Sequence, residues 1–345
     1  MVVADLMPAQ TARGRGIEAR CVLVTGGAGY IGAHACKALR ARGYLPVAYD
    51  NLVYGHPEFV RWGPFEKGEL TDVDRLRAAL RTHRPVAVMH FAGFAYVGES
   101  VTDPAKYYAN NVGGTLALLD AMLSESVLSL VFSSTCAVYG TPDSVPIAEN
   151  TVRRPVNPYG RSKLMVEQIL EDYSGAHGLR SIALRYFNAA GADPAGEVGE
   201  DHSPETHLIP LVLDVALGRR ENVTVFGNDY DTPDGTCVRD YVHVTDLAQA
   251  HVAAVERLES GTGHTAYNLG SGHGYSVLEV VDAARRVTGR PIPMVSGPRR
   301  AGDPARLVSM AGRAQADLGW RPQRSDLDTI LADAWRWHRQ RFGRG

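Results

Sequence analysis

The sequence predicts an α/β fold, a Rossmann-type doubly wound parallel sheet with a smaller, partly interleaved C-terminal substrate lobe. Three observations carry this prediction. Short apolar strands alternate with amphipathic helices between residues 21 and 186, a glycine cluster follows the first strand, and an acidic residue ends the second. This alternation is typical of a parallel sheet that helices cover on both faces.

Each element of this first domain is assigned from its hydrophobic period. Apolar, β-branched runs predict strands, whereas apolar residues that recur every three to four positions predict helices. Strands are expected at 21–25, 46–49, 85–90, 128–132 and 181–186, and helices at 30–42, 72–81, 105–124 and 158–174.

The pattern becomes less regular after about residue 188, where prolines are spread among loops and short helices. We expect a dinucleotide-binding domain over 20–188 and a substrate lobe over 189–235 and 271–345. A helix near 246–258 and an apolar strand at 266–269 predict that the first domain returns near 236–270. The expected elements end with an amphipathic helix at 321–340, which carries Trp335 and Trp337, and residues 1–19 are expected to form a flexible extension.

Composition narrows the class of protein. The net charge of −2 gives no electrostatic reason to expect a nucleic-acid or membrane partner. The 4 cysteines form no C-x-x-C pair, so we expect no zinc site of that spacing and no disulfide framework. No apolar run is long enough to span a membrane, and residues 1–19 lack the apolar core of a secretory signal. A cytoplasmic protein without a metal is expected.

The glycine cluster predicts a dinucleotide site. Gly26, Gly29 and Gly32 lie between the first strand and the first helix, where glycines let the backbone approach a pyrophosphate at the helix N-terminus. Asp50 ends the next strand and can accept a hydrogen bond from a ribose hydroxyl while repelling a 2′-phosphate. The predicted cofactor is therefore NAD rather than NADP.

Tyr159 and Lys163 are four residues apart on an expected helix, so both project from one face. A cation there would lower the pKa of the tyrosine and let it act as general base and acid on an alcohol. Thr135, expected just past the fourth strand, can share the substrate's hydrogen bond. The alternative is that Tyr159 and Lys163 form a surface contact without a catalytic role. The position of the helix argues against it, because the helix follows a strand whose carboxyl end faces the cofactor crevice.

Longer blocks carry a family resemblance. They include TGGAGYIG (25–32), SSTCAVYG (133–140), NPYGRSKLMVEQIL (157–170), DGTCVRDYVHV (234–244) and PRRAGDP (298–304). Over about residues 21–340 the chain resembles the UDP-glucose 4-epimerase family of extended short-chain dehydrogenases/reductases.

The resemblance implies roles for individual residues. Tyr159, Lys163 and Thr135 match the catalytic residues. The positions matched to the NAD site are Gly26, Gly29, Tyr30, Ile31, Gly32, Asp50, Asn51, Glu69, Leu70, Phe91, Ala92, Gly93, Asn110, Ser133, Tyr159, Lys163 and Tyr186. Those matched to the UDP-sugar site are Thr135, Tyr159, Asn188, His207, Leu208, Phe226, Arg239, Tyr241, Arg300, Asp303 and Leu307.

The implied reaction is the reversible 4-epimerisation of UDP-glucose and UDP-galactose, a step of galactose metabolism. Tyr159 takes the proton of the sugar 4-hydroxyl while C4 gives its hydride to tightly bound NAD. The 4-keto sugar then turns over, and the hydride returns to its opposite face. The family also implies a homodimer built on the helices at 105–124 and 158–174.

Four residues depart from the family pattern. Glu69 stands where many members have Asp, Ala95 replaces a lysine near the cofactor, and His207 replaces an Asn near the uracil. Leu307 occupies the position of a gate beside the sugar's C2 substituent, where a bulkier Tyr excludes N-acetyl groups. Activity on UDP-GlcNAc and UDP-GalNAc, or on UDP-xylose and UDP-arabinose, therefore stays open.

Three other functions are weighed against epimerisation. A sugar-nucleotide dehydratase needs an acid–base pair after Thr135, where this chain has Cys136 and Ala137. A net dehydrogenase would release its cofactor in each cycle and would leave the UDP-site residues unexplained. A non-catalytic dinucleotide-binding module would have no need of Tyr159, Lys163 and Thr135 together.

Overall fold

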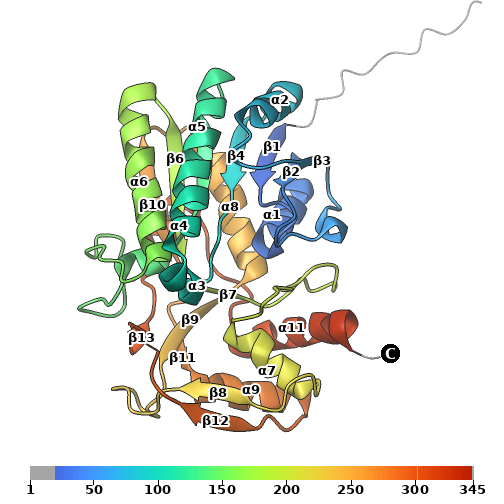
Figure 1. Cartoon of the computed structure of the whole chain (residues 1–345), viewed down its shortest axis with the longest axis vertical. Helices are drawn as coiled ribbons and strands as arrows, with labels where there is room; N and C mark the ends of the chain where they lie inside the picture. The colour runs from blue at the N-terminus through green and yellow to red at the C-terminus, as the bar shows by residue number, and fades with distance from the viewer. Residues whose placement is uncertain (1–19, 301, 344–345) are drawn as a thin grey trace, which may run out of the picture.

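The computed structural model describes residues 20–300 and 302–343. The expected extension at 1–19 lies outside these residues. Two lobes are stacked, with the smaller lobe below the carboxyl ends of the large sheet's strands (Figure 1). Within the described part of the chain, no helix combines the length and apolarity that a bilayer crossing requires.

The large sheet confirms the predicted fold class. Its seven parallel strands lie in the order β10-β6-β5-β4-β1-β2-β3. Because the order reverses between β1 and β4, a crevice opens at the carboxyl edge between them. The strands are β1 (Cys21–Thr25), β2 (Leu45–Asp50), β3 (Phe65–Lys67), β4 (Ala87–His90), β5 (Ser129–Thr135), β6 (Arg180–Tyr186) and β10 (His264–Leu269).

Helices cover both faces of this sheet, which is why its inner strands β1, β4 and β5 are buried along their whole length. α1 (Tyr30–Ala41) and α8 (Val244–Leu258) pack on one face. α2 (Val73–His83), α5 (Gly114–Ser124) and α6 (Pro158–His177) pack on the other. The two helix layers are visible in front of and behind the strands in Figure 1.

The structure differs from the predictions for this lobe in three details. The helix expected at 105–124 is present over Pro104–Ser124 but is not α-helical throughout: α4 (Pro104–Tyr107) leads into a π-helical turn, η2 (Tyr108–Gly113), and then into α5. Two successive glycines at 113 and 114 weaken a helix at this point. In addition, β5 runs on to Thr135, which ends the strand rather than following it. The short helix α3 (Val97–Thr102) was not expected.

The smaller lobe has a mixed sheet and a three-helix core. β9 (Val238–His243) pairs with β7 (Asn188–Ala190), β11 (Gly274–Ser276) and β13 (Arg306–Leu307). β8 (Val223–Phe226) and β12 (Met294–Gly297) form a separate parallel pair. The helices that share its core are α7 (Leu208–Ala216), α9 (Val277–Thr288) and α11 (Leu327–Phe342).

The remaining elements show how the lobes interleave. In the segment near 236–270, β9 belongs to the smaller sheet, whereas α8 and β10 belong to the larger lobe. α10 (Gly312–Leu318) also returns to the larger lobe and contacts β10 and α8. The 3₁₀ turns η1 (Pro57–Phe59) and η3 (Cys136–Tyr139) follow β2 and β5. The last helix begins at Leu327, later than the expected 321, because Asp326 caps it.

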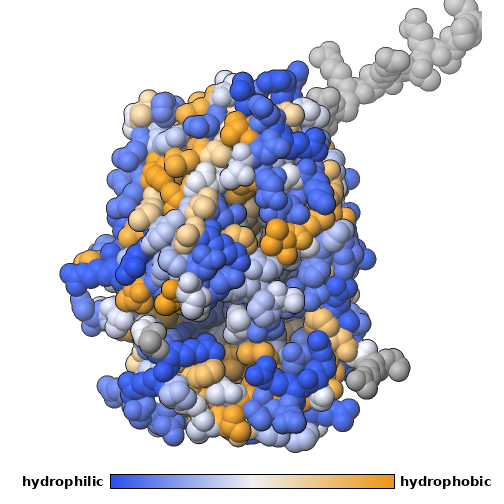
Figure 2. All heavy atoms as spheres, viewed as in Figure 1, coloured by the Kyte–Doolittle hydropathy of each residue, from blue (hydrophilic) through white to orange (hydrophobic). Residues whose placement is uncertain are grey.

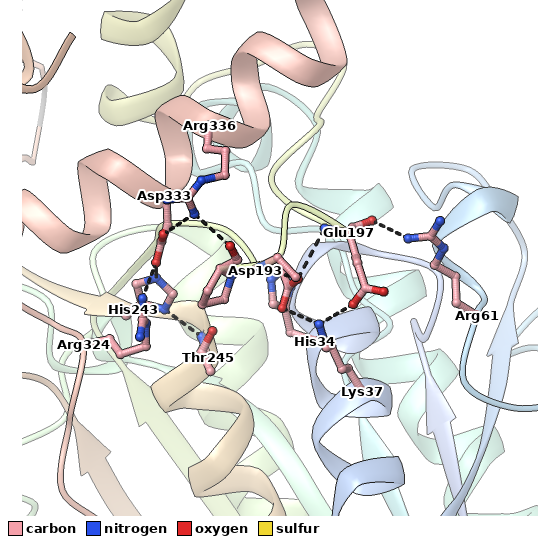
Figure 3. Close-up of polar contacts among 12 residues, drawn as sticks. His34, Lys37, Arg61, Asp193, Glu197, His243, Thr245, Arg324, Asp333 and Arg336 are labelled. Atoms are coloured by element: carbon pink, nitrogen blue, oxygen red, sulfur yellow. Dashed lines mark hydrogen bonds and ion pairs between the residues drawn. The ribbon is translucent and has the colours of Figure 1, made fainter.

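A polar network ties the loop at 193–197 to both lobes (Figure 3). On one side, the Lys37 ammonium on α1 donates to Asp193 Oδ1 at 2.7 Å and also contacts Glu197. On the other, Arg336 on α11 donates to the Pro194 carbonyl at 2.8 Å. The loop is therefore held between the first and the last helix of the described chain.

Candidate active site

A cleft of about 990 Å³ runs between the lobes at the carboxyl edge of the large sheet. Its lining extends from the loop between β1 and α1 to β13 of the smaller lobe. Figure 2 shows the surface hollowed at this level, between the two bodies of the molecule. The position is the one where open α/β sheets bind their ligands.

The glycine loop closes tightly against the sheet. Gly26 has a positive φ of 73°, and a Cβ there would lie 2.7 Å from the Ala92 nitrogen. A Cβ on Gly32 would lie 2.1 Å from the Gly26 carbonyl oxygen. α1 begins beyond Gly29, without a side-chain cap and without an acidic residue in its first turn. Its free N–H groups and positive dipole end therefore fit the pyrophosphate of NAD.

Asp50 is fixed by the same loop. Its carboxylate accepts hydrogen bonds from the Ala28 nitrogen at 3.0 Å and the Leu52 nitrogen at 2.8 Å. Burial raises its pKa, although these two bonds oppose the shift. The carboxylate lines the cleft at the end of β2 and retains lone pairs for a ribose hydroxyl. The residues present therefore fit NAD.

Local sequence places Tyr159 and Lys163 on the first turns of α6. The Asn157 side chain accepts from the Gly160 nitrogen at 2.8 Å, and Pro158 takes the first helical position. Gly160 lets the helix approach η3, since a Cβ there would be 2.6 Å from the Ala137 oxygen. Tyr159 and Lys163 are both buried at the cleft wall.

The strand ends complete this wall. Lys163 Nζ donates to the Ser133 carbonyl at 2.8 Å, and Ser133 Oγ lies 2.5 Å from the Tyr186 hydroxyl. Thr135 is the register partner of Tyr186 across β5 and β6, so its hydroxyl side chain stands beside the same wall. A phenol, an ammonium and a hydroxyl thus meet where an alcohol could exchange a proton.

The expected lowering of the Tyr159 pKa is not found. Burial raises the pKa of Tyr159, with the nearby Thr135 hydroxyl opposing it, and burial lowers the pKa of Lys163 to about 8. The reason is geometric: Lys163 Nζ is 6.0 Å from the centre of the Tyr159 ring and donates to a carbonyl instead. Burial therefore outweighs the ammonium in setting the pKa of this phenol.

The opposite wall belongs to the smaller lobe. Arg239 on β9 forms an ion pair with Asp303, and the Arg300 guanidinium lies 4.2 Å from the centre of the Phe226 ring. β13 pairs Leu307 with Arg239, and the Asn188 amide donates to the Asp240 carbonyl at 3.0 Å. Guanidinium groups and an aromatic face suit a diphosphate and a flat base.

Comparison with known proteins identifies the family. The family model described as "NAD dependent epimerase/dehydratase family" matches residues 22–270. The chain belongs to this family.

Individual relatives show which members of the family this chain is similar to. A protein named UDP-glucose 4-epimerase from Rhizobium meliloti (strain 1021) is 56% identical over 320 residues, which are 93% of this chain and 97% of that one. The crystal structure of a UDP-glucose 4-epimerase from Brucella ovis in complex with NAD has a TM-score of 0.91 and 54% identity, covering 94% of this chain and 99% of that one. A UDP-glucose 4-epimerase from Bifidobacterium longum in complex with NAD+ and UDP has a TM-score of 0.90 and 41% identity, covering 94% and 99%.

The cleft brings together every residue singled out from the sequence except one. Glu69 is exposed and does not line it; its carboxylate accepts from the Asn51 amide at 2.8 Å and so positions a neighbour. The cleft residues that the sequence analysis missed include Phe94, Tyr96, Glu200, His202 and Glu205. The spacing of the last three with His207, E-x-H-x-x-E-x-H, is a signal that could have found them.

Proposed function

We propose that this chain is an isomerase that interconverts UDP-glucose and UDP-galactose by 4-epimerisation, with NAD retained in the cleft. The observation that carries the proposal is the meeting of buried Tyr159, Lys163 and Thr135 at one wall, opposite the Arg239 and Arg300 pocket. The names of the relatives, and the NAD and UDP bound in two solved members of the family, support the same reading.

In this proposal Tyr159 takes the proton of the sugar 4-hydroxyl and later returns it. Thr135 shares the hydrogen bond of that hydroxyl and holds it at the phenol. Lys163, buried beside the strand end, supplies positive charge to the wall and binds a ribose of the cofactor. The glycine loop and Asp50 would hold NAD, which would supply the hydride acceptor and donor for C4.

The raised pKa of Tyr159 has a consequence for its proposed role. Burial disfavours the phenolate, so Tyr159 needs positive charge nearby to act as a base. Lys163 and the nicotinamide ring of NAD would supply that charge.

The UDP part would supply most of the binding energy. Arg239 and Arg300 bind the diphosphate, Phe226 packs beside the uracil, and Asp303 accepts from a ribose hydroxyl. Because these contacts are remote from C4, the sugar can turn over within the cleft without dissociating.

The test is incubation of the purified protein with UDP-galactose and no added cofactor. We expect UDP-glucose by chromatography or NMR and no net NADH by absorbance. Accumulation of NADH in proportion to substrate would instead indicate a net dehydrogenase. No product from UDP-galactose, UDP-GlcNAc or UDP-xylose, with NAD added, would leave only the role of a non-catalytic dinucleotide-binding module.

A wider range of sugars is the second candidate, and Leu307 is the observation that favours it. This side chain lines the cleft on β13 and is only partly buried. Leucine lacks the ring and hydroxyl of the tyrosine that narrows the gate in the family pattern. UDP-N-acetylhexosamines would then also be substrates.

A homodimer is proposed on the face of α5 and α6. Leu116 on α5 is 36% exposed and Met165 on α6 is 41% exposed, although both are apolar. Hydrophobic surface is visible over these helices in Figure 2. We expect a dimer by light scattering, and Met165→Glu should weaken it, whereas Val295→Glu, an exposed site on β12, should not. A wild-type monomer would overturn the assignment.

We also propose that the protein acts in the reducing cytoplasm, within galactose metabolism. All four cysteines are free thiols, and three of them are buried. Disulfides are the usual support of proteins in oxidising compartments, so free buried thiols favour a reducing one.

A further inference from the structure

Two glutamates and two histidines meet on the loop that leads into α7. Glu200, His202, Glu205 and His207 each offer one ligand atom, and these four atoms all lie within 4.8 Å of one another. The loop follows the segment at 193–197 that α1 and α11 hold in place. The four side chains thus converge on one point at the edge of the cleft.

The distances between the imidazole nitrogens and the carboxylate oxygens of this cluster are close to those of a tetrahedral metal site. His207 Nδ1 lies 2.7 Å from a Glu200 oxygen and 3.2 Å from a Glu205 oxygen. His202 Nδ1 lies 3.2 Å and 3.6 Å from oxygens of the same two glutamates. Metal–ligand bonds of about 2.0–2.1 Å at tetrahedral angles separate the ligand atoms by roughly 3.3 Å. The four nitrogen–oxygen separations, which involve both oxygens of Glu205, range from 2.7 to 3.6 Å around that value.

The geometry of His202 supplies an independent observation. Its Nδ1 atom is sealed from solvent and has no hydrogen-bond partner among the described residues, although two carboxylates lie close to it. In an ordinary ion pair the N–H would be directed at one oxygen. The His202 nitrogen therefore lies between two carboxylates without a well-directed hydrogen bond to either, a position that also suits a ligand of a common centre.

The surroundings exclude water from this side of the cluster. Tyr30 and Tyr96 present their rings edge-on to His202, each with a centroid distance of 6.2 Å. Both tyrosines are buried. Low polarity around a charged cluster strengthens the binding of a cation by paired carboxylates.

We propose that Glu200, His202, Glu205 and His207 bind one first-row divalent cation, above all zinc. Two neutral imidazoles and two carboxylates form the donor set, and the carboxylates balance the charge of the ion. Because all four ligands come from the protein, the site is closed and its role is structural. It pins the loop that delivers His207 and Leu208 to the cleft.

The competing arrangement is an ion-pair cluster with protonated imidazoles. Burial alone would lower the pKa of His202 and of His207, but Glu200 and Glu205 outweigh it and raise both values. Protons and a metal ion would therefore compete for the same nitrogen atoms. The two arrangements differ in what they bind, so a metal measurement separates them.

The test uses the full-length protein without an affinity tag, stripped with a chelator and then equilibrated with zinc. We expect one zinc ion per chain by elemental analysis, and Co²⁺ in its place should give the intense absorption of a tetrahedral site without thiolate charge-transfer bands. His202→Gln and Glu205→Gln should each weaken zinc binding by at least about tenfold. His83→Gln is the matched control, since His83 pairs with a single carboxylate, that of Glu66, at 2.8 Å.

Zinc binding by the wild type that both variants retain unchanged would overturn the proposal, as would no binding at all. Retained NAD and circular dichroism establish that each variant is folded. If a variant fails to fold, the Co²⁺ spectrum of the wild type decides: a weak, octahedral spectrum overturns the site. None of these measurements depends on epimerase activity, so this inference and the proposed function can fail separately.

Discussion

The phenol of Tyr159 and the ammonium of Lys163 lie on one helix face but make no direct pair. Lys163 is turned to the Ser133 carbonyl, and burial dominates the pKa of both groups. Spacing along a helix predicts which side chains share a face. It does not predict which of several nearby acceptors the longer side chain selects.

Tyr159→Phe is the sharpest test at this scale. Removing the hydroxyl leaves the ring in its buried position but takes away the proposed acid and base, so kcat on UDP-galactose should fall by about 10²–10⁴-fold. NAD content, measured after release from the protein, should stay the same. The control is Tyr173→Phe, the same change farther along α6, for which kcat should not change. Full activity in Tyr159→Phe would contradict the assignment.

Leu307→Tyr tests the sugar range. The larger side chain fills the cleft beside Arg239 on the neighbouring strand, where the C2 substituent is expected. The ratio of kcat/KM for UDP-galactose to that for UDP-GalNAc should rise by roughly tenfold or more. Initial rates on the two substrates measure it. A ratio that does not change would mean that another residue sets this gate.

At the scale of elements, α6 shows how a cap positions chemistry. Asn157 and Asp326 cap α6 and α11 in the same way, each accepting from a backbone nitrogen three residues on. Only α6 carries a proposed catalytic residue in its first turn. Loss of a cap therefore has a different consequence in the two helices.

We expect Asn157→Ala and Asp326→Ala each to lower the free energy of unfolding by about 1 kcal/mol. Asn157→Ala should also lower kcat several-fold, because the first turn frays and Tyr159 loses its position. Urea denaturation and initial rates on UDP-galactose provide the two measurements. Equal kcat values for the two variants would show that the cap acts on stability alone.

The elements predicted best are those in which a single hydrophobic period dominates. The strands β1 and β4 are buried along their whole length, and the helices α1 and α6 are buried along one side. The apolar residues of each sequence show this pattern directly. The helix at 105–124 was predicted as a regular α-helix because its apolar pattern is helical throughout, and the structure shows a π-helical turn within it. The π-helical turn within it brings Asn111 to the Phe94 backbone, where Asn111 Oδ1 accepts from the nitrogen at 2.8 Å. A contact between distant segments leaves no trace in a local period.

At the scale of the whole molecule, Asp333 holds the last helix against the rest of the smaller lobe. It is buried and lies 2.7 Å from both Arg324 and Arg336 and 3.3 Å from His243 at the start of α8 (Figure 3). Burial alone would raise the pKa of Asp333, but hydrogen bonds from these three partners lower it well below its usual range.

Asp333→Ala should lower the free energy of unfolding at pH 7 by about 2–3 kcal/mol, since both arginines keep some exposure and are partly screened. Because the folded carboxyl has the lower pKa, its contribution is present above about pH 4 and is lost as the pH falls further. Urea denaturation at two pH values measures both effects. The control is Asp282→Ala, an exposed pair with Arg285, with a change below about 0.5 kcal/mol. Equal losses in both variants would contradict the role of Asp333.

The sequence by itself determined the parallel sheet, the glycine loop, Asp50 and the Tyr159–Lys163 spacing. Each of these depends on residues close together in the chain, where backbone sterics and hydrophobic period act directly. Such local reasoning did not identify the residues of the second lobe. Arg239, Arg300 and Phe226 lie in no local pattern of their own, so only the family resemblance indicated them.

Only the tertiary structure decided which segments and side chains are neighbours in space. β9 joins the smaller sheet, Glu69 supports Asn51 outside the cleft, and Lys163 donates to a strand carbonyl. The convergence of Glu200 and Glu205 with two histidines also depends on a loop that distant helices hold. The physical reason is the same in each case: these contacts follow from packing between segments that are remote in sequence, and a local pattern carries no information about them.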